Sequence, residues 1–408
     1  MDRFLKKFLR PPRPDYAAAG DILRVLSVYM VGWYHIWQQS WLNPSLRIGN
    51  FNLNLVAPVR AGYMFVDLML MLSGFLLYLP YANRQECSPK AFYLKRALRI
   101  LPCYWLCLLV MLVYAWVQSG FPGDRKLGLD LLTHLTFTHN FFEFSYTQTR
   151  MNVVLWTLAV EVQFYLFLPA LAPAFRKKPL TCYLAMTAVS LCFRYLWTMP
   201  MQDTTLFVNR LPNMLDVYAN GMLAAHLYVR LAKDHKHRPL IAALGLVACV
   251  AGFVGLCHIL KVQARISGYD NVRLGQLRWR YLFSLCGAAF LLGGSLSFTP
   301  LRALFSNRLV RFLSAVSFNF YIWHQWLAVR LKAWRIPPYL AEANPNQVGE
   351  MPWQMQYTAV CFLGALAVAI LLTYLVEKPC ARLARKWIDR WCAAPPVRLF
   401  KGKNDNLG

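Results

Sequence analysis

Long apolar segments, each bounded by polar or basic residues, recur along almost the whole chain. A helix needs roughly 20 residues to cross a bilayer core about 30 Å thick. Segments of that length predict ten membrane-spanning helices, at about residues 22–42, 62–82, 97–119, 153–174, 179–199, 212–231, 239–260, 280–299, 311–330 and 355–376. The first, fifth and eighth spans are the least apolar, because Arg24, Arg194 and Arg280 lie inside them or at their ends. The pattern predicts an all-α, polytopic membrane helix bundle.

Composition supports this interpretation and excludes two other classes of protein. Of the 408 residues, 58% are apolar and only 15% are charged, against roughly 25% charged residues in soluble domains. The mean hydropathy is +0.35. A soluble enzyme and a disordered chain are both excluded, since each would need far more polar sequence. The eleven cysteines are scattered through apolar segments without paired spacing, so we expect no metal site and no disulfide framework.

The charge distribution predicts the orientation. The chain has 44 Lys and Arg against 18 Asp and Glu, a net charge of +26. Most of the basic residues fall in cytoplasmic segments if both termini are inside, as expected when loops retain Lys and Arg during insertion. This explains the basic excess without a nucleic-acid partner. One basic stretch, 261–280, falls on the predicted outer side, where either a helix boundary is wrong or a loop binds an anionic glycan or lipid headgroup.

The distribution of apolar and basic residues predicts three regions of the chain. Residues 1–20 form a basic cytoplasmic N-terminal segment, 21–376 the transmembrane domain and 377–408 a basic cytoplasmic tail. We expect no removable signal peptide. Only about 30 residues follow the last span, so we expect a stand-alone membrane domain without an appended secreted one.

Ionisable residues inside membrane spans are costly, and they indicate function. Arg24 and His35 are eleven positions apart, which is within about 20° of three helical turns, so they share a helix face with a rise of about 16 Å. Counted from the predicted span ends, four ionisable residues reach a similar level nearer the outer face, namely His35, Asp67, Glu161 and His324. We expect them to pair around a polar cavity, where a neutral histidine serves as a general base. The alternative for each histidine is an ordinary hydrogen bond between helices.

A second candidate site lies at the predicted cytoplasmic start of the third span. Arg96 and Arg99 are three residues apart and share a helix face, with Lys95 beside them. Guanidinium groups bind phosphate oxygens in pairs, so a phosphate-rich cytosolic ligand is one interpretation. Anchoring to lipid phosphates is the other.

These motifs, in this order, resemble integral-membrane acyltransferase family 3, and the resemblance covers most of the chain. The matching segments are Arg24 with His35, Phe65–Asp67 with Leu72–Phe75, Arg96 to Pro102, Trp156 to Tyr165, Asp216 with Gly221, Ser317 to His324, and Glu377 to Pro379.

The resemblance implies transfer of an acyl group, usually acetyl, from cytoplasmic acyl-CoA to a hydroxyl of an extracytoplasmic carbohydrate or lipid-linked glycan. It implies that His35 is the essential histidine. From the residues themselves we expect His35 to act as general base or acyl carrier, with Glu161 orienting it. Acyl-CoA is then a co-substrate rather than a bound cofactor, and membrane lipids are the remaining partners. The acyl-CoA-binding residues would be Arg24, Lys95, Arg96 and Arg99. The expected cavity and acceptor-side residues are Asp67, Ser73, Trp156, Asp216, Tyr321 and His324.

Two alternatives stay open. A transporter or sensor-like membrane module could use the same polar cavity without chemistry. His134 and His139 either contact the acceptor from an outer loop or are ordinary surface histidines.

Overall fold

A helix occupies each of the ten predicted spans in the computed structural model, which describes residues 8–383 except 50, 86–87, 120–124 and 340–342. The helices are α2 (Ala19–Ser40), α4 (Phe65–Ala82), α5 (Pro89–Ser119), α8 (Trp156–Lys177), α9 (Pro179–Cys192), α10 (Leu215–Lys233), α11 (Arg238–Gln263), α12 (Tyr269–Leu296), α14 (Arg308–Ala333) and α15 (Met351–Leu372). The all-α membrane bundle is confirmed. The ends of the two predicted terminal segments, 1–7 and 384–408, lie outside the described residues.

The ten helices differ in how apolar they are and in how much of their surface is buried. Among the described residues, six helices are long and apolar enough to cross a membrane, those containing α4, α5, α8, α9, α11 and α15. Five of these bury half or less of their most apolar window, whereas α4 buries 78% of it. The other four, α2, α10, α12 and α14, carry internal polar and charged side chains, many of them buried. Polar residues are tolerated in these four helices because neighbouring helices supply their partners.

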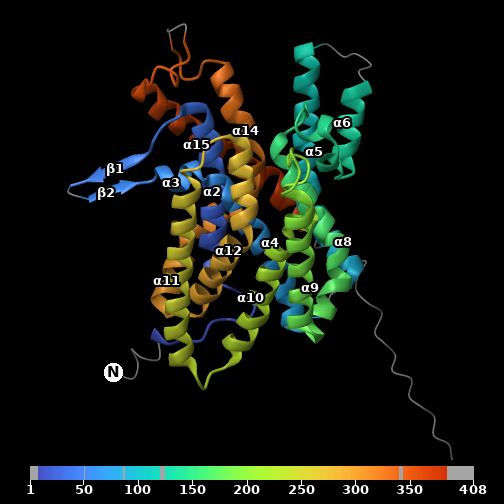
Figure 1. The fold of residues 1–408 in the computed structure, drawn as a ribbon, viewed down its shortest axis with the longest axis vertical. Helices are drawn as coiled ribbons and strands as arrows, with labels where there is room; N and C mark the ends of the chain where they lie inside the picture. The colour runs from blue at the N-terminus through green and yellow to red at the C-terminus, as the bar shows by residue number, and fades with distance from the viewer. Residues whose placement is uncertain (1–7, 50, 86–87, 120–124, 340–342, 384–408) are drawn as a thin grey trace, which may run out of the picture.

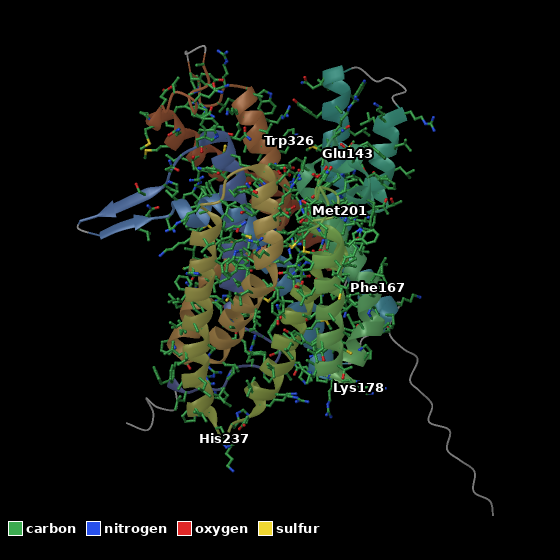
Figure 2. All side chains as sticks on the ribbon, viewed as in Figure 1. Glu143, Phe167, Lys178, Met201, His237 and Trp326 are labelled. Atoms are coloured by element: carbon green, nitrogen blue, oxygen red, sulfur yellow. The ribbon has the colours of Figure 1, made fainter. Side chains whose placement is uncertain are left out.

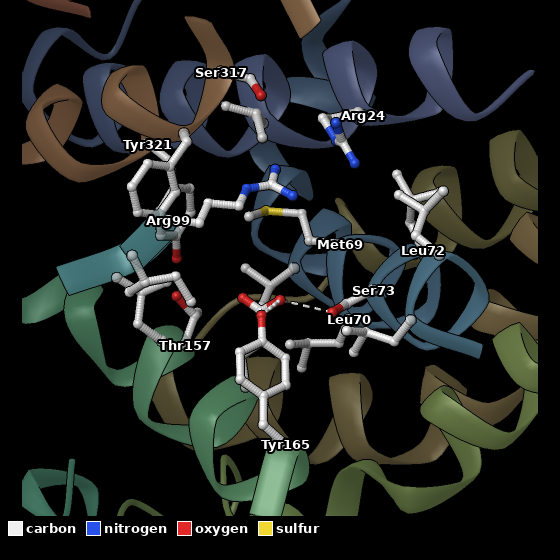
Figure 3. A pocket seen from close by; sticks show the side chains of 18 residues that line it. Arg24, Met69, Leu70, Leu72, Ser73, Arg99, Thr157, Tyr165, Ser317 and Tyr321 are labelled. Atoms are coloured by element: carbon white, nitrogen blue, oxygen red, sulfur yellow. Dashed lines mark hydrogen bonds between the residues drawn. The ribbon is translucent and has the colours of Figure 1, made fainter. Parts of the chain in front are cut away.

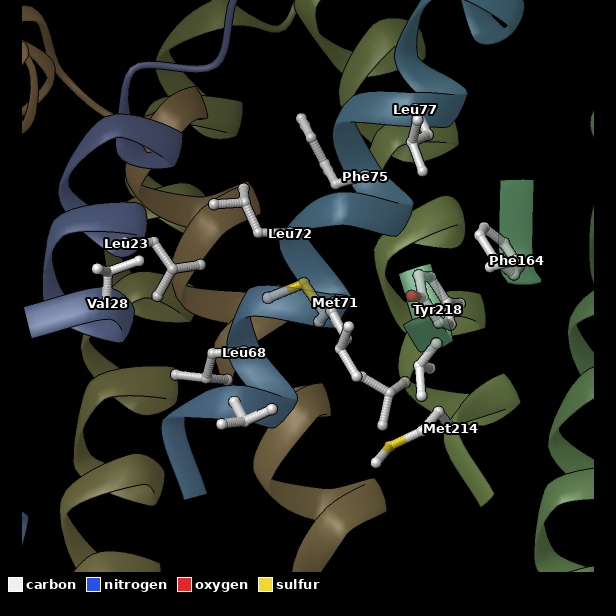
Figure 4. Packing of buried hydrophobic residues seen from close by; sticks show 14 of the residues in the cluster. Leu23, Val28, Leu68, Met71, Leu72, Phe75, Leu77, Phe164, Met214 and Tyr218 are labelled. Carbon is white, nitrogen blue, oxygen red and sulfur yellow. The ribbon is translucent and has the colours of Figure 1, made fainter. Parts of the chain in front are cut away.

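The centre of the bundle is closely packed around α4 (Figure 4). A side chain added at Gly221 of α10 would bring its Cβ within 2.0 Å of the Met71 carbonyl oxygen on α4. At Gly74 of α4 the added Cβ would be 2.6 Å from the Tyr218 carbonyl oxygen on α10. These two glycines let the helix backbones approach directly, as small residues do at helix contacts in membranes. The contact holds α4 firmly, and α4 carries part of the site described below.

Short elements cover the ends of the bundle. The strands β1 (Ser45–Ile48) and β2 (Phe51–Asn54) pair antiparallel, with Ser45 opposite Asn54, and project from the bundle ahead of α3 (Val56–Arg60) (Figure 1). The predicted outer loop 120–152 contains α6 (Arg125–Leu135) and α7 (Glu143–Tyr146). The helix α13 (Thr299–Phe305) precedes α14.

The helices run alternately up and down, so successive connections alternate between two ends. Lys178 and His237 lie at one end of the molecule, the end near the N-terminus, whereas Glu143 and Trp326 lie toward the other (Figures 1 and 2). Two of the predicted cytoplasmic connections are therefore at the same end. Which end faces the cytoplasm remains a prediction from the charge pattern.

The predicted start of the eighth span was wrong. The helix α12 begins at Tyr269 rather than near residue 280, so Arg273 and Arg280 are helix residues and not part of an outer loop. Arg280 is fully buried, and its Nε is 3.0 Å from Asp67 Oδ1. Arg273 lies 3.5 Å from Asp203 and 3.8 Å from Asp270. Of the two explanations for the basic stretch 261–280, the wrong helix boundary therefore accounts for Arg273 and Arg280. Both can lie in a helix because each is paired with a carboxylate.

Candidate active site

A cavity of about 130 Å³ lies among α2, α4, α5, α8 and α14 (Figure 3). Its lining is mostly apolar, from residues such as Val28, Val66 and Leu70. The polar and charged side chains that line it are Arg24, Ser73, Arg99, Thr157, Glu161, Tyr165, Ser317 and Tyr321. A mostly apolar pocket with a few convergent polar groups is typical of ligand sites.

Glu161 of α8 lies in this cavity and is held by two hydroxyl groups. Ser73 Oγ of α4 donates to Glu161 Oε1 at 2.7 Å, and the hydroxyl of Tyr165 donates to the same oxygen at 2.5 Å. Tyr165 is one helical turn after Glu161, so the two side chains lie on one face of α8. Hydrogen bonds to an ionised acceptor are short and strong, and these two fix the position of the carboxylate in the cavity.

Arginines from two helices face the same cavity as Glu161. Arg24 of α2 and Arg99 of α5 lie beside each other in the wall of the cavity (Figure 3). Arg24 interacts electrostatically with Arg99, Arg96 and Glu161. Asp21 and Glu377 also interact electrostatically with these arginines. In the cavity lining itself two guanidinium groups, Arg24 and Arg99, face one carboxylate, Glu161, which favours an anionic ligand.

The other two basic candidates lie outside the cavity wall. The guanidinium group of Arg96 lies over the rings of Phe92 and Tyr165, with 5.7 Å to each ring centroid. Lys95 is exposed. Arg96 therefore contributes charge beside the lining residue Tyr165, whereas Lys95 is not part of the lining.

The two intramembrane histidines contact each other directly. His35 Nδ1 on α2 is 2.8 Å from His324 Nε2 on α14. The two rings stack with centroids 5.1 Å apart and an interplanar angle of 24°. His324 is fully buried, whereas His35 keeps part of its surface exposed. The first and ninth predicted spans, which are far apart in the sequence, therefore contact each other through these two imidazole rings.

The histidine pair lies beyond the end of the cavity that is farther from Arg24. Val28, which lines the cavity, is seven residues before His35 on α2, a rise of about 10 Å. Tyr321 joins the two regions, since it lines the cavity and its ring centroid is 5.5 Å from that of His324. The charged cavity, Tyr321 and the imidazoles therefore follow one another along the bundle axis.

Several expected site residues lie elsewhere than the sequence predicted. The hydrogen bonds of Glu161 go to Ser73 and Tyr165 rather than to His35, which bonds to His324. Asp67 does not line the cavity, because it is fully buried against Arg280.

Asp216 is likewise buried, 2.9 Å from Arg194 and bonded by Ser190. A buried carboxylate needs a charged partner, and Arg194 and Arg280 supply it for Asp216 and Asp67. These arginines, noted in the sequence only as irregularities of two spans, were the signal for these ion pairs. Trp156 begins α8 but does not line the cavity.

His134 and His139 are not surface residues. Both are buried, and their rings stack in parallel at 3.9 Å. His134 Nδ1 is 3.1 Å from Asp130 Oδ1, and Asp130 also accepts hydrogen bonds from Thr149 and from the backbone N–H of Arg150. The cluster ties α6 to the segment that leads into α8. Within the described residues, no group of three or more His, Cys, Asp or Glu side chains could hold a metal ion.

The candidates from the sequence do not include three polar residues that line the cavity, Thr157, Tyr165 and Ser317. Of these, Tyr165 contacts Glu161 directly. Its spacing of four residues from Glu161 was the available signal, because side chains with that spacing meet on a helix surface.

Comparison with known proteins identifies the family of this chain. The family described as "Acyltransferase domain" matches residues 18–376. The chain is 25% identical to ORF330 of Acidianus two-tailed virus, provisionally named an acetyltransferase, over 74% of this chain and 80% of that protein. It is 23% identical to peptidoglycan O-acetyltransferase OatA of Listeria monocytogenes over 76% of this chain, which spans about half (49%) of OatA.

The exopolysaccharide production protein ExoZ of Rhizobium meliloti is 26% identical over 64% of this chain and 74% of its own length. No solved structure matches. The family match covers nearly the whole chain and includes every helix that lines the cavity, and we conclude that the chain belongs to the acyltransferase 3 family of multi-pass membrane O-acyltransferases.

Proposed function

We propose that this enzyme transfers an acyl group, acetyl in the simplest case, from cytoplasmic acyl-CoA to a hydroxyl of an extracytoplasmic carbohydrate or lipid-linked glycan. The observation that carries the proposal is the order of the polar groups along the bundle axis. Arg24 and Arg99 line the cavity, and the pair of His35 and His324 lies beyond the end of the cavity that is farther from Arg24. Relatives named for O-acetylation of peptidoglycan and for exopolysaccharide production support a glycan acceptor.

The cavity suits the donor end of this reaction. Arg24 and Arg99 present guanidinium groups to phosphates, and Arg96 adds charge beside them. The apolar part of the wall accommodates the slender arm that carries the thioester. That arm must cover the rise between Arg24 and His35, about 16 Å along α2.

His35 is the proposed reacting group. As a general base it takes the proton of the acceptor hydroxyl, the hydroxyl oxygen bonds to the thioester carbonyl carbon, and the carbon–sulfur bond breaks. The thiolate of CoA then receives the proton from His35, so the products are an ester and CoA thiol. As an acyl carrier, His35 would instead bond to the acyl carbon as the carbon–sulfur bond breaks and thiolate leaves. The acceptor hydroxyl oxygen would then displace the imidazole from the acyl carbon, and the hydroxyl proton would pass to the thiolate, giving the same ester and CoA thiol.

The test uses the purified full-length protein in detergent with radiolabelled acetyl-CoA and soluble or lipid-linked saccharide acceptors. We expect His35→Ala to lower transfer by roughly 10²–10⁴-fold, while acetyl-CoA binding stays near the level of the unsubstituted protein. Normal turnover by His35→Ala would remove the catalytic assignment. Passage of a labelled ligand across proteoliposomes without ester formation would favour a transporter instead.

A further inference from the structure

The hydrogen bonds around His324 determine where its proton lies. His324 Nδ1 is 2.7 Å from the carbonyl oxygen of Tyr321 and 3.3 Å from that of Phe320. A carbonyl oxygen can only accept, so Nδ1 must carry the hydrogen. In a neutral imidazole the other nitrogen is then an acceptor. His324 Nε2 therefore presents a lone pair to His35.

This assignment fixes the tautomer of His35 in turn. Since His324 Nε2 accepts, His35 Nδ1, 2.8 Å away, must donate. The proton of a neutral His35 is then on Nδ1, and its Nε2 bears the free lone pair. His35 Nε2 is thus the nitrogen that can take a proton or an acyl group.

We propose that His324 is a positioning residue, which holds His35 as its Nδ1–H tautomer and directs Nε2 toward the reactants. The proposal rests on the proposed function, in which His35 is the reacting group. It gives His324 a role distinct from the cavity or acceptor side to which the sequence assigned it.

The packing of α2 against α14 supports an oriented pair rather than a chance contact. Gly32 is three residues before His35, and a Cβ there would lie 2.6 Å from the Phe320 ring and 3.7 Å from His324 Cδ2. The missing side chain lets both rings approach α2. Phe320 also stacks on His324 with an interplanar angle of 7°. Because His324 is fully buried, water does not compete for its bond with His35.

The partner of His35 is a neutral imidazole, unlike the carboxylate that orients the histidine in a Ser-His-Asp triad. A neutral acceptor fixes the tautomer and the ring direction and contributes less to stabilising an imidazolium. Loss of His324 should therefore act mainly on kcat, and the KM for acyl-CoA should change little, since the arginine cavity is left intact. Where a triad histidine is left in the wrong tautomer, kcat falls by about 10⁴-fold.

The first experiment measures the tautomer in the unsubstituted protein. Nitrogen-15 labelling of its eight histidines, with His35 assigned by loss of its signals in His35→Gln, distinguishes protonated from unprotonated ring nitrogens. At a pH where His35 is neutral we expect a protonated Nδ1 and an unprotonated Nε2. A protonated Nε2 would overturn the proposal, and this result does not depend on the folding of a His324 variant.

The second experiment compares His324→Gln with His324→Leu. Glutamine can present an amide oxygen to His35 Nδ1, whereas leucine cannot. We expect His324→Leu to lower kcat by at least about 10²-fold at similar KM and His324→Gln to recover at least 10-fold of that loss. His226→Leu is the matched control, because His226 is a buried histidine on α10 whose Nδ1 is 3.3 Å from the Tyr78 hydroxyl. We expect it to keep normal kcat.

These outcomes distinguish a failure of the proposed catalytic role of His35 from a failure of the proposed positioning role of His324. If His35→Ala stays active, the proposed function of His35 fails. If His35→Ala is inactive but His324→Leu turns over as fast as His324→Gln, the catalytic role of His35 stands and the positioning role of His324 is rejected.

Discussion

At the scale of single residues, the positive charge of the cavity is unevenly shared among the four basic candidates. Arg24 and Arg99 line the wall, Arg96 lies over two aromatic rings beside it, and Lys95 is exposed. Arg99 is exposed as well, but it lines the cavity and can bind a ligand there directly, whereas Lys95 can act on the ligand only at a distance, where salt and water screen its charge. The four residues therefore should not contribute equally to binding an anionic donor.

We expect Arg99→Ala to weaken acyl-CoA binding by roughly 10–100-fold, because a hydrogen bond to a charged group contributes about 1.5–3 kcal/mol. Lys95→Ala, four residues earlier on the same helix, should change the affinity less than about 3-fold. Calorimetric titration of the detergent-solubilised protein at two salt concentrations measures both effects. Equal affinities of the two variants would indicate that Arg99 binds lipid phosphates rather than the donor.

The sequence predicted which residues lie in the region of the site better than it predicted which of them contact one another. The spacing of Arg24 and His35 predicted a shared helix face, and both lie on α2, with Val28 between them facing the cavity. Depth along a helix is readable from sequence because the rise per residue is constant. The direction in which each helix faces its neighbours is not, so the sequence placed Asp67 beside the histidines although Arg280 is its partner.

At the scale of elements, apolar length located the helices but not their ends. All ten predicted spans contain a helix, yet α12 begins before its apolar segment does. A buried ion pair can extend a helix past the point where hydropathy would end it. The sequence did not predict α6 within the 120–152 segment, where Asp130 and His134 are buried among residues 19 and 30 positions away, Thr149 and Tyr104.

The contact between α4 and α10 gives a prediction at this scale. Gly221→Ala places a methyl group against the Met71 carbonyl, at 2.0 Å, so the helices must separate. We expect a loss of stability of at least about 1–3 kcal/mol. Because α4 carries Ser73 into the cavity, acyl transfer should fall as well. Thermal unfolding in detergent and the transfer assay measure these two effects.

Gly364→Ala on α15 is the matched control. A Cβ at Gly364 meets nothing within 4 Å, and alanine is favoured over glycine in a helix by about 1 kcal/mol. We expect unchanged or slightly raised stability and normal transfer. If Gly221→Ala behaved like Gly364→Ala, the close approach of α4 and α10 would not matter for the site.

At the scale of the whole molecule, the bundle has an apolar exterior around a more polar interior. One side of α11 exposes a continuous set of large apolar side chains, Leu240, Leu244, Val247, Val250, Phe253 and Val254. Such a surface is unstable in water and suited to lipid. The inner helices α2 and α14 carry the histidine pair, shielded from lipid by their neighbours. The proposed reaction uses acyl-CoA from the cytoplasm, so it requires that the end of the bundle near the arginine cavity face the cytoplasm.

Orientation is tested by labelling cysteines introduced at exposed positions of opposite ends. We expect Gln347→Cys, in the 331–354 segment, to react with a membrane-impermeant maleimide in intact cells. Lys236→Cys, in the basic connection between α10 and α11, should react only after permeabilisation. The unsubstituted chain gives the background from its own cysteines, of which Cys192 is exposed. Arg24 is near the start of α2, at the same end as His237, so the reverse labelling pattern would place the arginine cavity outside the cell and remove cytoplasmic acyl-CoA as the donor.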